Sequence, residues 1–389
     1  MRDLLSFCEA EQAWLRAAIE ALVQIESPTT DKRAVDACGA RVAGLMREMG
    51  GAVEVIAQPR AGNHLLGVFP PPTTPTRTHV PTTRVLLLGH FDTVWDIGQI
   101  ERMPLVERDG RLFGPGIFDM KGGLSIALQA IRALRHAGWP EGLEVRCLWT
   151  SDEETGSATS RALIEREAQA CAAALVFEPA LTNGEVKTAR KGVGHFDISV
   201  TGVSAHSGID PGAGASAVHA LARLITSLEA LNDPARGISV NAGVIRGGTR
   251  SNVVAESAEA EVDVRVVRAE DGPRMDQALR SLADADPRIT VRVQGGIDRP
   301  PFERTPAVAS LYESARGVAQ ELGFDLGEGA TGGASDGNFT GALGVPTLDG
   351  LGAVGGGAHA LDEHLNIAWL PKRAALAAGL LRRLASTMT

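Results

Sequence analysis

The hydrophobic positions of this chain follow two periods, which separate predicted helices from predicted strands. Apolar residues recur three or four positions apart in amphipathic stretches, which predict helices at 10–25, 32–49, 123–137, 159–168, 307–322 and 370–384. Apolar runs with few or no breaks predict buried strands at 53–56, 65–68, 85–88, 143–149, 173–177 and 345–351. Because strands and helices alternate, we expect an α/β fold with a mostly parallel sheet flanked by helices.

A different order of elements occupies the middle of the chain. Strands are predicted at 196–200, 238–245, 258–267 and 289–293, and helices at 215–231 and 272–283. The order β-α-β-β-α-β is typical of a ferredoxin-like α+β unit. We therefore expect residues 188–298 to form a second domain, inserted between the two parts of the α/β domain, 1–187 and 299–389.

Composition narrows the possible classes of function. The length of 389 residues favours two domains. A net charge of −9 without any run of Lys or Arg argues against nucleic-acid binding. The start of the chain lacks a signal-peptide pattern, and no run reaches about 18 apolar residues, so we expect a cytoplasmic protein with no membrane segment. The four cysteines show no paired spacing, so we assign them neither a disulfide nor a metal.

Residues 70–81, rich in Pro and Thr, are predicted to be an exposed loop.

Candidate chemistry lies where the predicted strands end. The strand at 85–88 is followed by His90 and Asp92, whose side chains point the same way in an extended chain. On their own they fit either a metal ligand with its orienting partner or an acid–base pair. Further carboxylates and one imidazole follow later strands or glycine-rich turns: Asp119, Glu153, Glu154, Glu178 and His359.

Each of these groups, taken singly, also has an ordinary explanation. Asp119 fits a turn residue, and Glu153 with Glu154 fits the start of a helix, which favours negative charge. Together they favour a ligand site at one edge of a parallel sheet. Two imidazoles with three or more carboxylates suit a divalent metal, Zn²⁺ first and Co²⁺ or Mn²⁺ as alternatives. The number of ligands suits two ions about 3.5–4 Å apart that share one carboxylate.

The remaining histidines are given structural or peripheral roles. Asp362 and His364, close to His359, are interpreted as rim residues. Histidines without an acidic partner in a motif are assigned to the structure: His64, His79, His136, His195 and His219.

Five stretches, in this order and spacing, resemble the M20 family of metallopeptidases and amidohydrolases, and most of all its glutamate carboxypeptidase branch. They are 89–94 (GHFDTV), 114–123 (GPGIFDMKGG), 152–157 (DEETGS), 177–179 (FEP) and the glycine-rich segment that leads to His359. The resemblance implies a catalytic domain with two zinc ions and an inserted lid or dimerisation domain. The implied metal ligands are Asp119 as the bridge, His90 and Glu178 for one ion, and Glu154 and His359 for the other. Glu153 is the implied general base, and Asp92 holds the His90 tautomer.

The inserted domain carries further residues that the resemblance assigns. His206, in Val203–Gly208, is implied to reach the active site of the partner subunit in a homodimer and to stabilise the tetrahedral oxyanion. Asn252 resembles a substrate-binding asparagine, whereas Arg265 is interpreted as a structural residue. Family carboxypeptidases often carry an arginine where this chain has Ala330. We therefore expect either that Arg250 holds the substrate carboxylate instead or that the substrate is not a free glutamyl peptide.

The resemblance implies a homodimeric, zinc-dependent hydrolase that cleaves an amide bond next to a carboxylate-bearing amino acid. The expected substrate is a small peptide, as for glutamate carboxypeptidase. Residues 335–339 (SDGNF) are more similar to the desuccinylase branch, so an N-acyl-amino-acid deacylase is the alternative. A hypothesis from another class is a metal-binding dimer without catalytic activity, against which the presence of Glu153 argues.

Overall fold

The computed structural model describes residues 1–71 and 82–387 and divides into two compact units. The first unit comprises Met1–Ala189, Arg304–Ala330 and Ser335–Thr389, and the second comprises Arg190–Glu303 and Thr331–Ala334. The loop predicted at 70–81 lies outside the described residues from 72 onwards, and so does His79.

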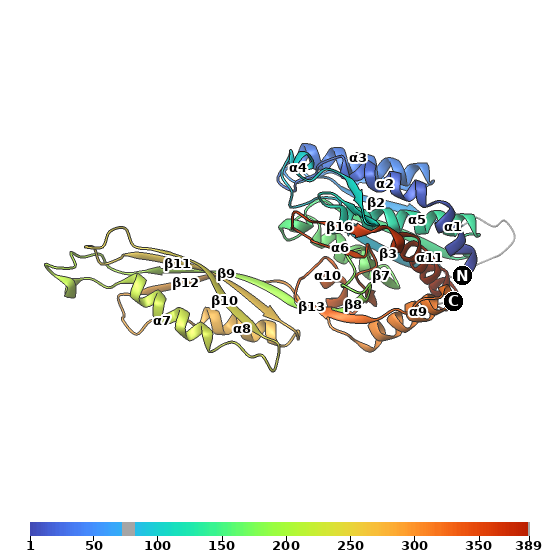
Figure 1. Cartoon of the computed structure of the whole chain (residues 1–389). Helices are drawn as coiled ribbons and strands as arrows, with labels where there is room; N and C mark the ends of the chain where they lie inside the picture. The colour runs from blue at the N-terminus through green and yellow to red at the C-terminus, as the bar shows by residue number, and fades with distance from the viewer. Residues whose placement is uncertain (72–81, 388–389) are drawn as a thin grey trace. The chain divides into compact units, whose positions relative to one another are not determined.

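The first unit is built on a six-stranded sheet, which Figure 1 shows with its helices. In spatial order its strands are β1 (Ala52–Ile56), β2 (His64–Phe69), β6 (Leu143–Thr150), β3 (Thr83–His90), β7 (Ala173–Val176) and β14 (Thr347–Leu348). The last four run parallel to one another, whereas β1 and β2 are antiparallel to their neighbours. The predicted α/β class with a mostly parallel sheet is therefore confirmed.

Both faces of the sheet are buried at the central strand β3, as its unbroken apolar run predicts. Val85 and Leu87 belong to the large hydrophobic cluster, and Leu86 and Leu88 belong to a separate cluster. The large cluster includes residues of α1 (Arg2–Ala10), α2 (Gln12–Val23), α3 (Lys32–Glu48), α5 (Gly122–His136), α9 (Pro306–Leu322) and α11 (Leu370–Thr387). The separate cluster includes residues of α6 (Arg161–Gln169) and α10 (Gly337–Ala342).

The N-terminal helical region differs from its prediction. The periodicity predicts one helix over 10–25, but the chain forms α1 and α2 with a break at Glu11. Helix α1 was not predicted because its nine residues bury only Leu4 and Cys8, which are too few to show a period.

Short strands bring distant segments of the first unit together. β15 (Gly355–Gly356), β16 (His364–Asn366), β5 (Arg111–Phe113) and β4 (Val106–Arg108) form an antiparallel sheet in that order. This sheet places the segment around residue 360 beside the segment that precedes residue 114. Three further elements are α4 (Gln99–Arg102) and the paired strands β8 (Val186–Arg190) and β13 (Glu328–Thr331).

The second unit is a ferredoxin-like domain, as predicted. Its elements follow the order β9 (Gly192–Thr201), α7 (Ala217–Glu229), β10 (Ser239–Gly247), β11 (Ser257–Val266), α8 (Asp271–Arg280) and β12 (Thr290–Arg299). The four strands are antiparallel in the spatial order β10-β11-β9-β12. Inward-facing residues of these strands share one hydrophobic cluster with the two helices.

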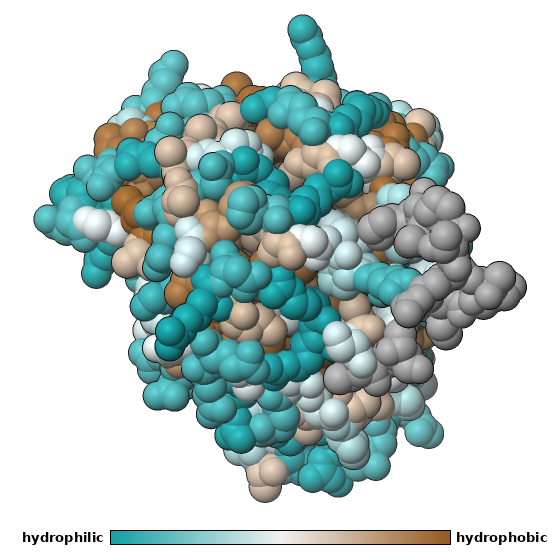
Figure 2. All heavy atoms as spheres, turned by 90° about the vertical axis from the view of Figure 1, so that its right-hand side faces the viewer, coloured by the Kyte–Doolittle hydropathy of each residue, from teal (hydrophilic) through white to brown (hydrophobic). Residues whose placement is uncertain are grey.

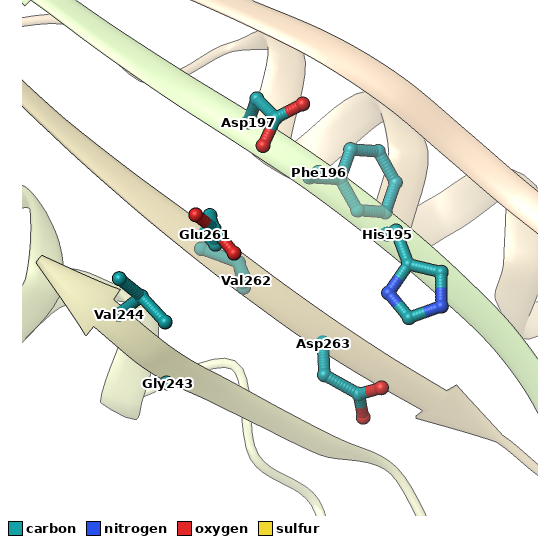
Figure 3. Close-up of a pocket in the computed structure, with 8 residues that line it drawn as sticks. All are labelled: His195, Phe196, Asp197, Gly243, Val244, Glu261, Val262 and Asp263. Atoms are coloured by element: carbon teal, nitrogen blue, oxygen red, sulfur yellow. The ribbon is translucent and has the colours of Figure 1, made fainter. Parts of the chain in front are cut away.

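The exposed face of this second sheet holds a shallow acidic pocket (Figure 3). His195 and Asp197 of β9 lie opposite Asp263 and Glu261 of β11, respectively. Phe196, between the first two, belongs to the buried cluster. Among the described residues, the clusters of His, Asp and Glu side chains that could bind a metal ion do not include these four. This pocket is therefore not the candidate metal centre.

No helix among the described residues is long and apolar enough to cross a membrane. Figure 2 shows one face of the molecule, on which hydrophilic side chains separate small hydrophobic patches.

Candidate metal centre

Three adjacent parallel strands deliver ligand side chains to one edge of the first sheet. β3 ends at His90 itself, and β6 and β7 end at Thr150 and Val176, shortly before Glu154 and Glu178. The spatial order β6-β3-β7 makes these strand ends neighbours. The arrangement is the one expected for a ligand site at the carboxyl edge of a parallel sheet.

The loop that carries Asp119 packs closely against the same edge. A Cβ atom on Gly123, near the start of α5, would lie 2.0 Å from the carbonyl oxygen of Phe177. Only glycine permits so close an approach between a helix and a strand end. The glycine pair at 122–123 thus allows the Asp119 loop to reach the strand end that precedes Glu178.

Asp119 lies between two histidines. His90 Nε2 is 3.4 Å from Asp119 Oδ1 and 3.6 Å from Glu178 Oε1. His359 Nε2 is 3.5 Å from Asp119 Oδ2 and 3.3 Å from Glu154 Oε2. The structure therefore brings all five predicted ligands together. Each oxygen of Asp119 faces a different histidine, and each histidine also lies beside a different glutamate.

The donor set fits divalent metal ions. Asp119 Oδ1 and Glu154 Oε1 are buried but make no hydrogen bond to any described residue. Buried carboxylate oxygens without a partner are costly unless a cation compensates them. One candidate oxygen or nitrogen atom from each of His90, Asp119 and Glu154 lies within 4.8 Å of the others, and the same holds for His90, Glu153 and Glu178.

The ligands perturb one another strongly. Hydrogen bonding to Asp119 and Glu154 raises the pKa of His359 to about 10. Burial alone would lower the pKa of His90, but Asp119 and Asp92 outweigh it and raise that pKa. Burial would raise the pKa of Asp119, yet His359 and His90 together lower it. Burial raises the pKa of Glu154. Such shifts are common where charged groups are arranged for chemistry.

Asp92 organises the turn that carries Glu153 and Glu154. Its carboxylate accepts hydrogen bonds from the Thr29 hydroxyl (2.7 Å) and from the main-chain N–H of Glu154 (3.2 Å) and Glu153 (3.4 Å). His90 Nδ1 is 3.0 Å from the main-chain oxygen of Asp92 and 3.4 Å from its Oδ1. Nδ1 therefore carries the proton, and Nε2 is left to bind an ion.

His359 adopts an unusual backbone conformation. Its φ of +61° lies in the left-handed region, which residues other than glycine seldom adopt. Strained conformations of this kind cluster at functional sites. Of the rim residues predicted beside it, Asp362 is exposed and His364 is half-buried.

Some polar residues of the first unit that support the centre were not predicted, among them Arg373 and Glu363. Arg373 of α11 is fully buried and donates to the main-chain oxygens of Gly352 (3.0 Å), Gly184 (2.9 Å) and Gly350. Gly352 N in turn donates to the main-chain oxygen of Glu178 (2.9 Å). Arg373 is one of several basic residues in the helical period of α11, so nothing in the sequence distinguishes it.

Three predicted residues of the second unit lie in one region of it. His206 forms a bridge to Val253, next to Asn252, and Arg250 lines an open pocket with Ser207 and other residues. The N–H groups of Gly208 and Ile209 donate to His206 Nδ1 at 3.1 and 3.2 Å. The proton of the neutral ring is therefore on Nε2, which can donate a hydrogen bond.

The turn that follows Ala330 also has basic neighbours within the second unit. Arg190 Nη1 donates to the main-chain oxygens of Gly333 (3.1 Å) and Ala334 (3.2 Å). Arg265, interpreted from the sequence as structural, donates to Asp263 at 2.7 Å and to the main-chain oxygen of Gly332 at 3.4 Å.

Comparison with known proteins agrees with this geometry. Residues 86–383 match the model of peptidase family M20/M25/M40. The chain belongs to this family. It is therefore a metal-dependent hydrolase of the M20 peptidases and amidohydrolases, as the resemblance implied.

Relatives within the M20 family differ in how much of the chain they match. Carboxypeptidase G2 of Pseudomonas sp. (strain RS-16) is 29% identical over 392 residues, which cover 98% of this chain and 92% of that protein. An acetylornithine deacetylase of Erwinia tasmaniensis is 32% identical over 235 residues, or 56% of this chain and 60% of that protein.

Solved structures share the fold of this M20 hydrolase. Aminopeptidase PepT from Bacillus cereus superimposes with a TM-score of 0.78 at 20% identity, covering 96% of this chain and 99% of that one. An M20 family metallo-carboxypeptidase from Sulfolobus solfataricus gives a TM-score of 0.73 at 16% identity, with coverages of 96% and 99%.

Proposed function

We propose that this M20 hydrolase is a two-zinc carboxypeptidase that releases a carboxylate-bearing amino acid from a small peptide. The observation that carries the proposal is the position of Asp119, whose two oxygens face His90 and His359 separately. A shared carboxylate flanked by two further ligand pairs is the arrangement of a two-metal hydrolase. Bound zinc ions would polarise the scissile carbonyl and increase the acidity of water.

In the proposed mechanism Glu153 transfers the proton of the attacking water, and Asp92 supports Glu153. The Glu153 carboxylate lies within 4.8 Å of ligand atoms of His90 and Glu178, and Asp92 accepts the main-chain N–H of the same residue. We assign Glu153 as the general base that takes the proton of the attacking water and passes it to the leaving nitrogen. Asp92 keeps the Glu153 turn in place.

We assign stabilisation of the oxyanion to His206 of the partner subunit in a homodimer. The two backbone N–H groups that donate to Nδ1 keep the proton on Nε2. A fixed N–H donor of this kind stabilises the charge that develops on a tetrahedral intermediate.

The substrate carboxylate needs a basic partner, and Ala330 does not provide one. Arg250 is exposed in the second unit and lines a pocket with Ser207 and Ser251. We propose that Arg250 binds the substrate carboxylate and that Asn252 makes an adjacent contact with the substrate. The carboxypeptidase function is favoured because carboxypeptidase G2 matches 98% of this chain, whereas the acetylornithine deacetylase of Erwinia tasmaniensis matches 56%.

The experiment is a substrate panel measured with the zinc-loaded protein. The panel contains acyl and dipeptide substrates with C-terminal glutamate, together with N-acetylornithine and N-succinyl amino acids. We expect the highest kcat/KM for the C-terminal glutamate substrates. A preference for the acetyl or succinyl substrates would refute the carboxypeptidase and leave the N-acyl-amino-acid deacylase.

Arg250 is tested on the same panel. Arg250→Ala should raise KM for glutamate substrates about 10- to 100-fold, the value of a charge-assisted hydrogen bond. The matched control is Arg246→Ala, which removes an exposed arginine that pairs with Glu261 (2.6 Å). Equal KM values for the two variants would show that Arg250 does not bind the carboxylate.

A further inference from the structure

The carboxylate of Glu363 is buried beside the metal centre without being one of its ligands. Its side chain is 1% exposed, and four N–H donors converge on its two oxygens. The donors are Trp95 Nε1 (2.7 Å), Gly116 N (2.8 Å), Phe118 N (2.9 Å) and Asp119 N (3.0 Å). A carboxylate has about four lone-pair sites, so these donors use its acceptor capacity. Glu363 is thus occupied by the protein itself and not by an ion or a substrate.

The main chain of Glu363 also makes hydrogen bonds to two segments of the chain. Its carbonyl oxygen accepts from Gly114 N (3.3 Å), and its N–H donates to the carbonyl oxygen of Ala360 (3.0 Å). One of the segments held in this way carries Asp119, and the other carries His359. Glu363 therefore connects the loop that carries Asp119 to the loop that carries His359. These loops are distant in sequence, since Asp119 and Glu363 lie 244 residues apart.

We propose that Glu363 is a positioning residue that fixes the distance between Asp119 and His359. The inference rests on the two-metal centre proposed above. The ion that His359 would hold takes one ligand from each loop, Asp119 and His359, and Glu363 contacts both loops. At the other ion, His90 and Glu178 are carried by the ends of β3 and β7, so that only the bridging Asp119 depends on Glu363. The two ions should therefore respond unequally to a change at Glu363.

Glu363→Gln is the sharpest perturbation because it preserves the shape of the side chain. Each carboxylate oxygen accepts two of the four N–H donors. In either orientation of the glutamine amide, its NH₂ group therefore faces two N–H donors and repels them. We expect one of the two zinc ions to bind about 10- to 100-fold more weakly, as is typical when a residue that orients metal ligands is changed.

The experiment is a zinc titration of the metal-free protein against a competing chelator. It compares wild type, Glu363→Gln and Asp362→Asn, which changes the exposed neighbouring carboxylate in the same isosteric way. We expect two zinc ions with unchanged affinities in Asp362→Asn. Glu363→Gln should weaken one ion more than the other, with kcat restored by excess zinc and KM unchanged.

Two results would contradict the account, and they differ from each other. Glu363→Gln with a lower Tm but both zinc affinities unchanged would show that Glu363 is merely structural. Wild type that binds a single zinc ion would overturn the two-metal centre and the inference that rests on it. If Glu363→Gln does not fold, Trp95→Phe removes one of the four donors. Trp95→Phe should weaken the same zinc ion less strongly, and unchanged zinc affinities in it would overturn the proposal.

Discussion

Replacing Arg373 should destabilise the first unit more than any exposed arginine does. The guanidinium donates to three buried main-chain oxygens, those of Gly184, Gly350 and Gly352. Arg373→Met leaves all three without a donor, at about 1–3 kcal/mol each, or about 3–9 kcal/mol together. Part of this cost is offset because a buried charge is removed, which is often worth about 1–4 kcal/mol. From the middle of both ranges, about 6 kcal/mol offset by about 2.5 kcal/mol, the net loss is about 3–4 kcal/mol. This is a large fraction of the 5–15 kcal/mol typical of a folded domain.

The assay is urea unfolding of the metal-free protein, with Arg382→Met as the control. Arg382 lies on the same helix and pairs at 3.0 Å with Asp3, whose side chain is 50% exposed, so its loss should cost less than about 1 kcal/mol. Arg373→Met should also weaken zinc binding, because Gly352 N donates to the main chain of Glu178. Equal unfolding free energies for the two variants would refute the reasoning about the three carbonyls.

Four further predictions concern the metal centre and its supporting contacts. Glu153→Gln should retain two zinc ions but lose about 10²- to 10⁴-fold in kcat. If this variant kept the kcat of the wild type, Glu153 would not be the general base. Thr29→Val removes the hydroxyl that donates to Asp92 and should lower the free energy of unfolding by about 1.5–3 kcal/mol, whereas the exposed control Thr30→Val should change it by less than about 0.5 kcal/mol. Because the pKa of His359 is raised to about 10 in the metal-free protein, zinc must displace a proton there, so zinc affinity measured by calorimetry should rise from pH 6 to pH 8. The same raised pKa stabilises the metal-free fold below about pH 6.5, so its Tm should fall as the pH rises toward 10.

The grouping of the side chains at the candidate metal centre could be predicted because they follow recognisable local patterns in the sequence. His90, Glu154 and Glu178 each follow an apolar run that is long enough to be recognised as a buried strand. Parallel strands put their carboxyl ends at one edge, so neighbouring strands bring such residues together. Asp119 was indicated by the glycines around it, which the close packing of Gly123 against Phe177 explains.

The supporting residues could not be predicted because their partners are distant in sequence. Glu363 lies between Asp362 and His364, and nothing in that run shows that only the middle residue is buried. Its four donors come from segments more than 240 residues earlier. The Thr29 hydroxyl likewise contacts Asp92 across 63 residues. Periodicity reports the environment of a residue along its own element, but not its partner on another element.

The central claim is that Asp119 bridges two ions, and X-ray absorption spectroscopy of the zinc-loaded protein tests it most directly. The account predicts two zinc ions per chain and a zinc–zinc scattering distance of about 3.5–4 Å. It predicts that both features are lost together in Asp119→Ala, because each oxygen of Asp119 faces a different histidine. A fully loaded wild-type protein with one zinc ion per chain, or with no zinc–zinc scattering, would contradict it.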